Sequence, residues 1–533
     1  MPSQTEFLII DGETLSYEKI FEYIENPHLQ VALSIEAINR VNHYRSAVDQ
    51  WLVDEKKVIY GVTTGLGKLK DFVVDERNQN EFQRKILLSH AVGLGPDFPE
   101  QVVRLAMLLR ANVFARGNSG VRIEFIERIL QLLNKGVYPC VPQIGSLGVG
   151  DLQPMAHIGL CLIGAPEGKA RFRGDKGISP DILAKAQIVP ITFEMTAKEA
   201  LSLIDGSTMV LAASIYAYYQ AQQLCKIADM AAALNIEATR GEMNALDPRI
   251  HEVNNLQSEQ DTARILREFL EGSQWTTDEG RKRLGELKPR VQDAVSIRST
   301  AQVHGAIKDV LQYIQSILDR EMNASKDNPL IFFDGVNFES LSGGNYHGAH
   351  LSYALDFMGI VITDLAVISE RRSARLLDPF MSYGLPTNLV AKAGLNTGFA
   401  LVHANATAMV GEIRILATPA SVGSIPAKGN QEDHNSMAMG AVRKLMHMIE
   451  LAQQVLAIEL LVAAQAIDLI SENMQGLCMG KGTFAIHRWI RLSIEPMWED
   501  RFILPDLEKM IEFVKSGQIL GQFPPYNMKK IAR

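Results

Sequence analysis

Two loops of the sequence carry residues whose types and spacing could support chemistry. The first begins at Tyr60 and contains three glycines, which allow the backbone to approach a ligand closely. It is not a phosphate-binding loop, because it lacks the spacing and the Lys-Ser/Thr ending of a Walker motif. The second, Gly145–Asp151 (GSLGVGD), has three glycines before an expected helix start, with Asp151 suited to cap that helix and Pro154 to lie in its first turn. Each loop alone is an ordinary glycine-rich turn or helix start.

Two further segments carry charge. A buried Arg298 could clamp a carboxylate by paired hydrogen bonds, although most arginines lie in surface ion pairs. Residues 430–436 set seven consecutive polar side chains ahead of an apolar helix. Polarity alone would make this segment a solvated loop, so its function depends on what lies around it.

Long helices are predicted to position these segments. Glycine and proline are absent from Ser207 to Arg240 and from Ala441 to Gln475, and apolar residues recur there at three- and four-residue spacing. Both stretches exceed the usual helix of ~10–14 residues, so the fold class is predicted to be mainly α, a bundle of long helices. Further helices are predicted at Leu29–Asp54, Glu76–Ala91, Glu100–Ala115, Gly120–Lys135, Thr300–Asn323 and Ser352–Arg375.

Two domains are predicted, with a boundary near residue 200. Residues 1–200 would form an N-terminal domain that carries the Tyr60 loop and the Gly145–Asp151 loop. Residues 201–533 would form the helix bundle with Arg298 and Glu432. Within it, Ser258–Lys288 is rich in charge and poor in apolar periodicity, which predicts an exposed excursion.

The composition argues against several classes of partner and site. The chain has 533 residues, of which 47% are hydrophobic, and a net charge of −8 without a basic patch, so no nucleic-acid partner is expected. Its four cysteines lie far apart without a CxxC pair, so neither a disulfide framework nor a metal site is expected. The most apolar stretch, Val455–Ile470, is shorter than the ~20 residues of a membrane span. No signal sequence is recognised, and a cytoplasmic protein without a membrane partner is predicted.

In order along the chain, these segments resemble the aromatic amino acid ammonia-lyases and aminomutases, most closely the histidine ammonia-lyases. The resemblance extends from about Val58 to Gln475. The matching stretches are YGVTTGLGKL, SHAVGLG, ARGNSGVR, GSLGVGDLQPMAH, LIDGST, SIRSTAQVHGA, NASKDNPLIF, SGGNYHG, ISERR and NQEDHNSM. Many ordered matches make the resemblance specific, although each alone is weak.

The resemblance implies a mainly helical homotetramer whose active sites combine loops from three chains. It implies that Tyr60 is the catalytic tyrosine and that Arg298 binds the substrate carboxylate. It also implies that Asn345 and Glu432 are polar residues of the active site. The substrate would be a small carboxylate.

Two positions resemble the histidine lyases in particular. Gln431 and Glu432 form the pair found in those enzymes, where phenylalanine and tyrosine lyases tend to carry Asn-Gln. His90 falls at a position that contacts the ring of the substrate, and a histidine there resembles the histidine and tyrosine lyases.

Three departures fall on the family's prosthetic group, methylidene-imidazolone (MIO), which relatives form from an Ala-Ser-Gly triplet. Here Gly148-Val149-Gly150 precedes Asp151, one residue shorter than the family's GSxGASGDL and without the serine whose dehydration creates the methylidene. Asp205 replaces the family's asparagine beside the group, and Val295 replaces a tyrosine of the active site. MIO is therefore not expected as a cofactor.

Three functions remain open. One is a lyase of altered chemistry, in which Tyr60 is the general base, Arg298 holds a carboxylate, and Glu432 with His90 binds a ring or a second polar group. Asp205 would face a trimethylammonium group that leaves as neutral trimethylamine. This resembles ergothionase, an MIO-less branch that acts on ergothioneine, the betaine of a thiolated histidine. The second is a conventional histidine or aromatic amino acid ammonia-lyase. The third is a catalytically silent homologue that serves as a binding or assembly subunit.

Overall fold

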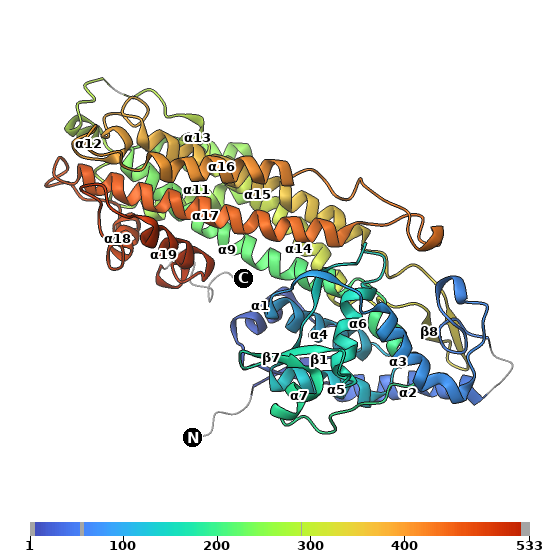
Figure 1. Cartoon of the computed structure of the whole chain (residues 1–533). Helices are drawn as coiled ribbons and strands as arrows, with labels where there is room; N and C mark the ends of the chain where they lie inside the picture. The colour runs from blue at the N-terminus through green and yellow to red at the C-terminus, as the bar shows by residue number, and fades with distance from the viewer. Residues whose placement is uncertain (1–5, 54–57, 289, 524–533) are drawn as a thin grey trace. The chain divides into compact units, whose positions relative to one another are not determined.

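The structure, a computed structural model, describes residues 6–53, 58–288 and 290–523 and is mainly helical, as predicted (Figure 1). It divides into two compact units. Unit 1 comprises Met1–Ala217, Ile314–Asp356 and Pro419–Arg443, and unit 2 comprises Tyr218–Tyr313, Phe357–Thr418 and Lys444–Arg533. These units differ from the contiguous domains 1–200 and 201–533, because each is assembled from three separate stretches of chain. Glu432 consequently belongs to unit 1, together with the Tyr60 loop.

Unit 1 combines short helices with four small sheets. Its helices are α1 (Tyr17–Glu25), α2 (Ile35–Val53), α3 (Gln79–His90), α4 (Glu100–Ala115), α5 (Ile123–Lys135), α6 (Leu152–Leu162), α7 (Ser179–Lys185) and α8 (Glu199–Ile204). Strands β1 (Phe7–Ile10) and β2 (Gln30–Leu33) are parallel, whereas β3 (Leu94–Asp97) and β5 (Pro142–Ile144) are antiparallel. The remaining strands form the antiparallel sheet β4 (Val137–Pro139), β6 (Lys169–Phe172) and β7 (Asp175–Ile178) and the hairpin β8 (Leu330–Phe333) and β9 (Phe338–Leu341).

Helix α4 lies in the core of unit 1 and is hydrogen-bonded to the end of α8 and to the segment before β8. Every residue of this helix from Val102 to Ala115 is buried, including Arg110. The Arg110 guanidinium donates to the carbonyls of Ser202 (3.0 Å), Lys326 (3.2 Å) and Asp205. It thereby satisfies carbonyls at the end of α8, where helical hydrogen bonds run out.

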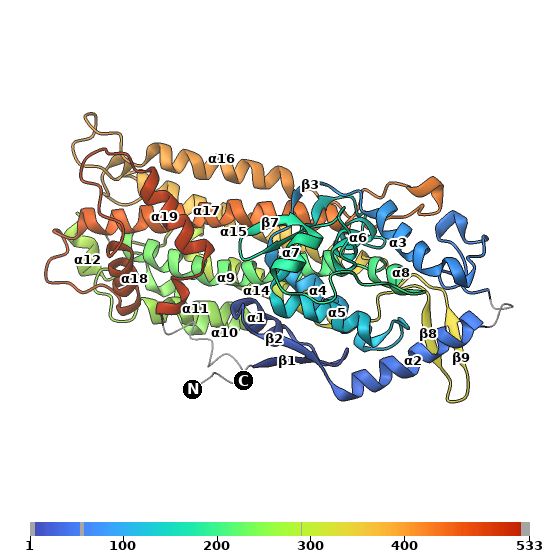
Figure 2. The same ribbon diagram turned by 60° about the horizontal axis from the view of Figure 1, so that its bottom comes forward.

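Unit 2 contains most of the long-helix bundle. The long helices that contribute to it run side by side in both Figures 1 and 2: α9 (Thr208–Ala238), α14 (Thr300–Met322), α15 (Ala349–Leu377), α16 (Ala400–Leu416) and α17 (Ala438–Ile470). The shorter helices are α10 (Pro248–Asn254), α11 (Gln257–Phe269), α12 (Asp278–Arg283), α13 (Val295–Arg298), α18 (Lys481–Arg491) and α19 (Leu504–Lys515). The prediction of a mainly α fold with long helices is confirmed.

Two local predictions are wrong. The predicted helix Leu29–Asp54 begins only at Ile35, because Gln30–Leu33 is a strand that pairs with β1; Asp54 lies outside the described residues. The segment Ser258–Lys288 is not an exposed excursion. Its helix α11 buries one face, with Leu266 and Phe269 almost completely covered. The charged residues on the outer face of α11 dominate the composition of this segment, so its apolar inner face was not recognised in the sequence.

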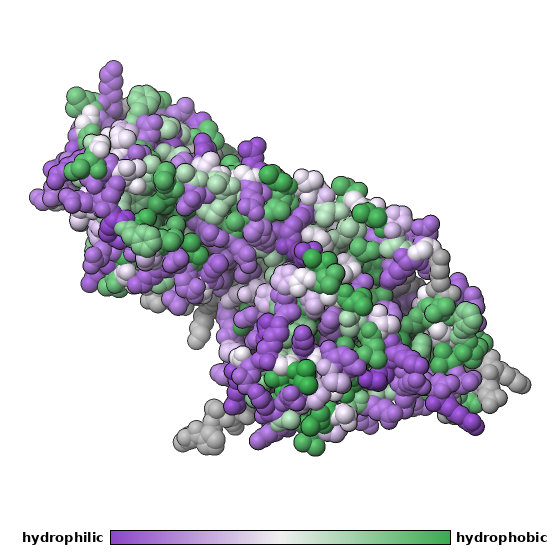
Figure 3. All heavy atoms as spheres, viewed as in Figure 1, coloured by the Kyte–Doolittle hydropathy of each residue, from purple (hydrophilic) through white to green (hydrophobic). Residues whose placement is uncertain are grey.

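Among the described residues, three helical stretches are long and apolar enough, by length and composition, to cross a membrane: Glu199–Ala238, Ala349–Leu377 and Ala438–Ile470. The prediction that the apolar stretch ending at Ile470 is too short for a span is therefore wrong, because its helix begins at Ala438. Between 61% and 94% of the apolar window of each stretch is buried within the protein. On the face shown in Figure 3, apolar and hydrophilic side chains are interspersed. Burial in the bundle therefore accounts for much of the apolar composition of these helices.

A buried ion pair joins α8 to the segment before β8 in unit 1. Lys198 donates to Asp327 (2.9 Å) and to the Ser202 hydroxyl (2.8 Å), and neither charged side chain is exposed. Removal of one partner from such a pair leaves an uncompensated buried charge, which costs more than the pair itself contributes.

The substitution Lys198→Met is therefore expected to lower the free energy of unfolding by about 3–5 kcal/mol, measured by urea unfolding. The matched control is Lys185→Met, because Lys185 pairs with Asp175 at 3.0 Å on the surface. The control should cost no more than about 1 kcal/mol. Equal effects of the two substitutions would contradict the role assigned to Lys198.

Candidate active site

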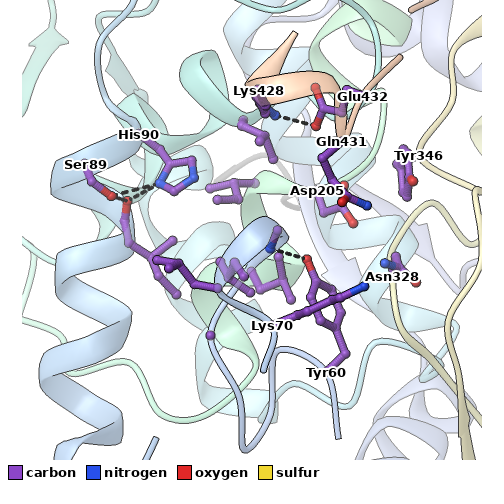
Figure 4. A pocket seen from close by; sticks show the side chains of 18 of the residues that line it. Tyr60, Lys70, Ser89, His90, Asp205, Asn328, Tyr346, Lys428, Gln431 and Glu432 are labelled. Carbon is purple, nitrogen blue, oxygen red and sulfur yellow. Dashed lines mark hydrogen bonds and ion pairs between the residues drawn. The ribbon is translucent and has the colours of Figure 1, made fainter. Parts of the chain in front are cut away.

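Unit 1 contains a cavity of about 870 Å³ that collects most of the predicted site residues. Its walls come from the loop after Tyr60, the end of α3, the Gly145–Asp151 loop, the end of α8, the segment after β9 and the turn at residues 428–432. In Figure 4, Ser89 and His90 lie at the left, whereas Asp205, Asn328 and Tyr346 lie at the right. Of the predicted site residues, the cavity brings together Tyr60, His90, Val149, Asp205, Gln431 and Glu432.

Tyr60 is half-buried, and its hydroxyl accepts a hydrogen bond from the Gly67 amide (3.1 Å). Its loop packs closely on α8, since a Cβ on Gly61 would lie 2.1 Å from the Leu201 side chain. Burial raises the pKa of Tyr60, and the nearby carboxylates of Asp205 and Glu432 raise it further. The phenol is therefore protonated at neutral pH, and it becomes a better base only when positive charge enters the cavity.

His90 is the last residue of α3, and its Nδ1 lies 2.8 Å from the Ile86 carbonyl. Burial lowers the pKa of His90, and the positive charge of Lys428 acts in the same direction. Because a carbonyl only accepts, Nδ1 must carry the proton in the neutral ring. The other ring nitrogen, Nε2, is then an acceptor for a donor group of a ligand.

Glu432 is held in an ion pair with Lys428, whose Nζ lies 2.6 Å from Oε1. The two residues close a turn in which the Ala427 amide donates to the Glu432 carbonyl (2.9 Å). Lys428 also lines the cavity and was not identified from the sequence. Its four-residue spacing from Glu432 was the available signal.

Asp205 follows α8 as its C-cap, and its side chain is largely buried. Its carboxylate accepts from the Gly206 amide (3.0 Å). Burial raises the pKa of Asp205 to about 7, and the neighbouring Asp327 carboxylate adds to this effect. A Cβ on Gly150 would lie 2.9 Å from Oδ1 of Asp205, so this carboxylate stands directly against the Gly145–Asp151 loop.

Hydrogen bonds to its backbone groups fix the Gly145–Asp151 loop on two sides. On one side the Gly150 amide donates to the Tyr346 carbonyl (3.3 Å), and the Gly348 amide donates to the Gly148 carbonyl (2.9 Å). On the other, the Ser436 hydroxyl donates to the same Gly148 carbonyl (2.7 Å). The polar groups of the loop are thus paired with distant parts of unit 1.

Asp151 and Val149 of this loop have different roles. Asp151 begins α6, but its carboxylate does not cap the helix as predicted; it accepts from Ser146 (2.7 Å) and from the Val210 amide (2.9 Å). Burial raises the pKa of Asp151 to about 6. The buried Val149 side chain lines the cavity, and Leu152 and Ile204 extend this apolar surface.

Five predicted site residues do not line this cavity: Gly148 and Gly150, which flank Val149 in the loop, and Asn345, Arg298 and Val295. Asn345 donates to the Ser325 carbonyl (3.2 Å), and its neighbour Tyr346 lines the cavity instead. Arg298 and Val295 lie on α13 in unit 2, where Arg298 donates to the Gln292 side chain. Val295 lines a separate cavity of unit 2, of about 500 Å³.

Sequence reasoning also missed Lys70, Asn328 and Tyr346, which all line the cavity of unit 1. Asn328 accepts from the Gly343 amide (2.8 Å) and the Ser342 hydroxyl (3.0 Å). The signal for Asn328 and Tyr346 was present, since both lie in stretches that match the family. Within the described ranges, no group of three or more His, Cys, Asp or Glu residues could hold a metal ion.

Comparisons with known proteins agree with this fold. The histidine ammonia-lyase of Alkaliphilus oremlandii is 42% identical over 514 residues, which cover 96% of this chain and 97% of that relative. The solved structure of histidine ammonia-lyase from Trypanosoma cruzi has a TM-score of 0.86 at 32% identity and covers 98% of this chain and 95% of its own. Ergothionase from Treponema denticola, solved with desmethyl-ergothioneine sulfonic acid, has a TM-score of 0.88 at 28% identity and covers 97% and 100%.

The model of one protein family, described as aromatic amino acid lyase, matches residues 15–492. This match covers most of the sequence and includes both loops and the polar turn that line the cavity. The chain therefore belongs to the aromatic amino acid lyase family.

Proposed function

We propose that this chain is a lyase that eliminates trimethylamine from an imidazole-type betaine such as ergothioneine, without MIO. The observation that carries this proposal is the Asp205 carboxylate, which stands against Gly150 where the family has a neutral amide. A carboxylate favours a cation beside it, whereas an electrophile that must accept electrons is disfavoured there.

The residues of the Gly145–Asp151 loop do not fit MIO. Val149 has no hydroxyl to lose as water, so no methylidene can form there. An alanine at position 148 is also disfavoured, because a Cβ on Gly148 would lie 2.2 Å from the Ser436 hydroxyl oxygen. We expect an uncyclised backbone through Gly148-Val149-Gly150.

A betaine substrate removes the need for an electrophile. Tyr60, as phenolate, takes a proton from the carbon next to the ring, and the electrons of that C–H bond form the carbon–carbon double bond. The C–N bond breaks, and its electron pair leaves with nitrogen as neutral trimethylamine. The substrate's own positive charge offsets Asp205 and Glu432, the two carboxylates that raise the pKa of Tyr60. The bound substrate thus helps to ionise its own base.

The part of the cavity between His90 and Glu432 suits an imidazole ring. His90 Nε2 can accept from one ring N–H, and the Glu432 carboxylate, held by Lys428, can accept from another. Arg298 would bind the substrate carboxylate from another subunit of a homotetramer, as the family resemblance implies. We place the protein in the cytoplasm as part of the same proposal.

A conventional histidine ammonia-lyase is the second candidate. It is favoured by the 42% identity to a histidine ammonia-lyase and by the Gln431-Glu432 pair. It requires a route to MIO that the triplet Gly148-Val149-Gly150 does not offer.

Purified protein should release trimethylamine from ergothioneine or from the trimethylammonium betaine of histidine. It should release no urocanate, cinnamate or coumarate from histidine, phenylalanine or tyrosine, because a primary amine leaves poorly without MIO. The intact mass should equal that of the unmodified sequence. Urocanate release at an ordinary enzymatic rate, with a mass lower by two waters, would instead establish the conventional enzyme. Inactivity toward all of these compounds would favour a silent subunit.

Arg298→Ala should weaken the binding of a carboxylate ligand by about 2–5 kcal/mol, because the charge of the ligand loses its partner. Calorimetry with the betaine of histidine measures this change. Arg264→Ala is the control, since Arg264 lies in an exposed pair with Glu268. An effect of Arg298→Ala no larger than that of the control would remove Arg298 from the site.

Betaine binding should strengthen as pH rises through about 7, because Asp205, whose pKa is raised to about 7, then becomes an anion. Below that pH, each unit should weaken binding by up to about tenfold. Asp205→Asn, which restores the family's residue, should flatten this dependence. A pH profile unchanged by the substitution would show that another group controls binding.

A further inference from the structure

Tyr346 is a second phenol at the end of the cavity that holds Asp205 (Figure 4). Backbone contacts fix its position, because its carbonyl accepts from the Gly150 amide (3.3 Å) and the next residue, His347, forms a β-bridge with Val149. Asp205 also stands against Gly150. Tyr346 and Asp205 therefore both lie against the same glycine.

The charges around Tyr346 tie it to the same group of residues. Burial raises the pKa of Tyr346, and the carboxylates of Asp205 and Glu432 raise it further, followed by Tyr60. Two phenols and two carboxylates are thus within electrostatic reach of one another. The Tyr346 phenol stays neutral at physiological pH, so its ring remains an electron-rich face rather than a base.

A quaternary ammonium group needs this kind of surrounding. It has no N–H, so hydrogen-bond acceptors such as an amide carbonyl gain little from it. Aromatic faces and carboxylates attract it through its charge. Apolar side chains can contact its methyl groups, and Val149 and Ile204 line the cavity near Asp205.

We infer that Tyr346 and Asp205, together with Tyr60, form the subsite for the trimethylammonium group, and that the Tyr346 ring sets the preference for a trimethylated over a primary ammonium. This inference rests on the proposed function. It identifies Tyr346 as a specificity residue. Neither the loss of the MIO-forming serine nor the aspartate at position 205 points to this residue. The ring rather than the hydroxyl is the recognising group, because a quaternary nitrogen offers nothing for the hydroxyl to accept.

The test compares the binding of histidine and of its trimethylammonium betaine by calorimetry. Wild-type protein should prefer the betaine. Tyr346→Leu should weaken betaine binding by about 10- to 30-fold and leave histidine binding within about threefold, since only the quaternary cation loses the aromatic face. Tyr346→Phe keeps the ring and should preserve the preference.

Phe82→Leu serves as the matched control, because Phe82 lines the same cavity from α3. It should leave the ratio of the two affinities unchanged. Circular dichroism and thermal unfolding establish that each variant folds. The inference is overturned if Tyr346→Leu weakens both ligands equally, if Tyr346→Phe loses the preference as fully as Tyr346→Leu, or if wild-type protein does not prefer the betaine.

The binding readout separates this inference from the proposed function. Preferential binding of the betaine that depends on the Tyr346 ring, without trimethylamine release, would uphold the subsite and reject the elimination. Release of trimethylamine at wild-type affinity by Tyr346→Leu would uphold the elimination and reject the subsite.

Discussion

The hydrogen bonds of the Gly145–Asp151 backbone are the constraint on which the site depends. They join this loop to the segment after β9 and to the segment before α17, which lie far away in the sequence. Two of its glycines have left-handed backbone conformations, with φ of 79° at Gly148 and 74° at Gly150, and both are in close contact with other segments. A side chain at either position would push these segments apart. The cavity therefore keeps its shape only while both positions of the loop are glycine.

One buried carboxylate determines much of the electrostatics of the cavity. Burial raises the pKa values of Tyr60, Tyr346 and Asp205, and the Asp205 carboxylate raises those of the two tyrosines further. Without a ligand, these groups oppose one another's ionisation. A bound cation relieves the conflict, so the arrangement favours positively charged ligands over neutral ones of the same shape. Burial that raises pKa values in this way is typical of functional sites.

Much of the scaffold could be predicted from the sequence, and less of the site. Helix α4 was predicted with its observed bounds, because its glycine- and proline-free apolar stretch is explicit in the sequence. The strand Gln30–Leu33 was missed, since its pairing with β1 is tertiary. Tyr60, His90 and Glu432 could be located from motifs. Lys428 and Tyr346 were missed although a signal for each was present, because their place in the cavity depends on how distant loops meet.

The overall resemblance and the residues of the site lead to different expectations about the reaction of this chain. The 42% identity to a histidine ammonia-lyase reflects the whole chain, in which most positions serve helix packing. The reaction depends on few positions, and Val149 and Asp205 alter both the group that would form the electrophile and the charge beside it. A scaffold can keep its core while such positions change, because cores respond to volume and polarity rather than to reaction type. The proposed function therefore rests on these site residues rather than on the overall identity.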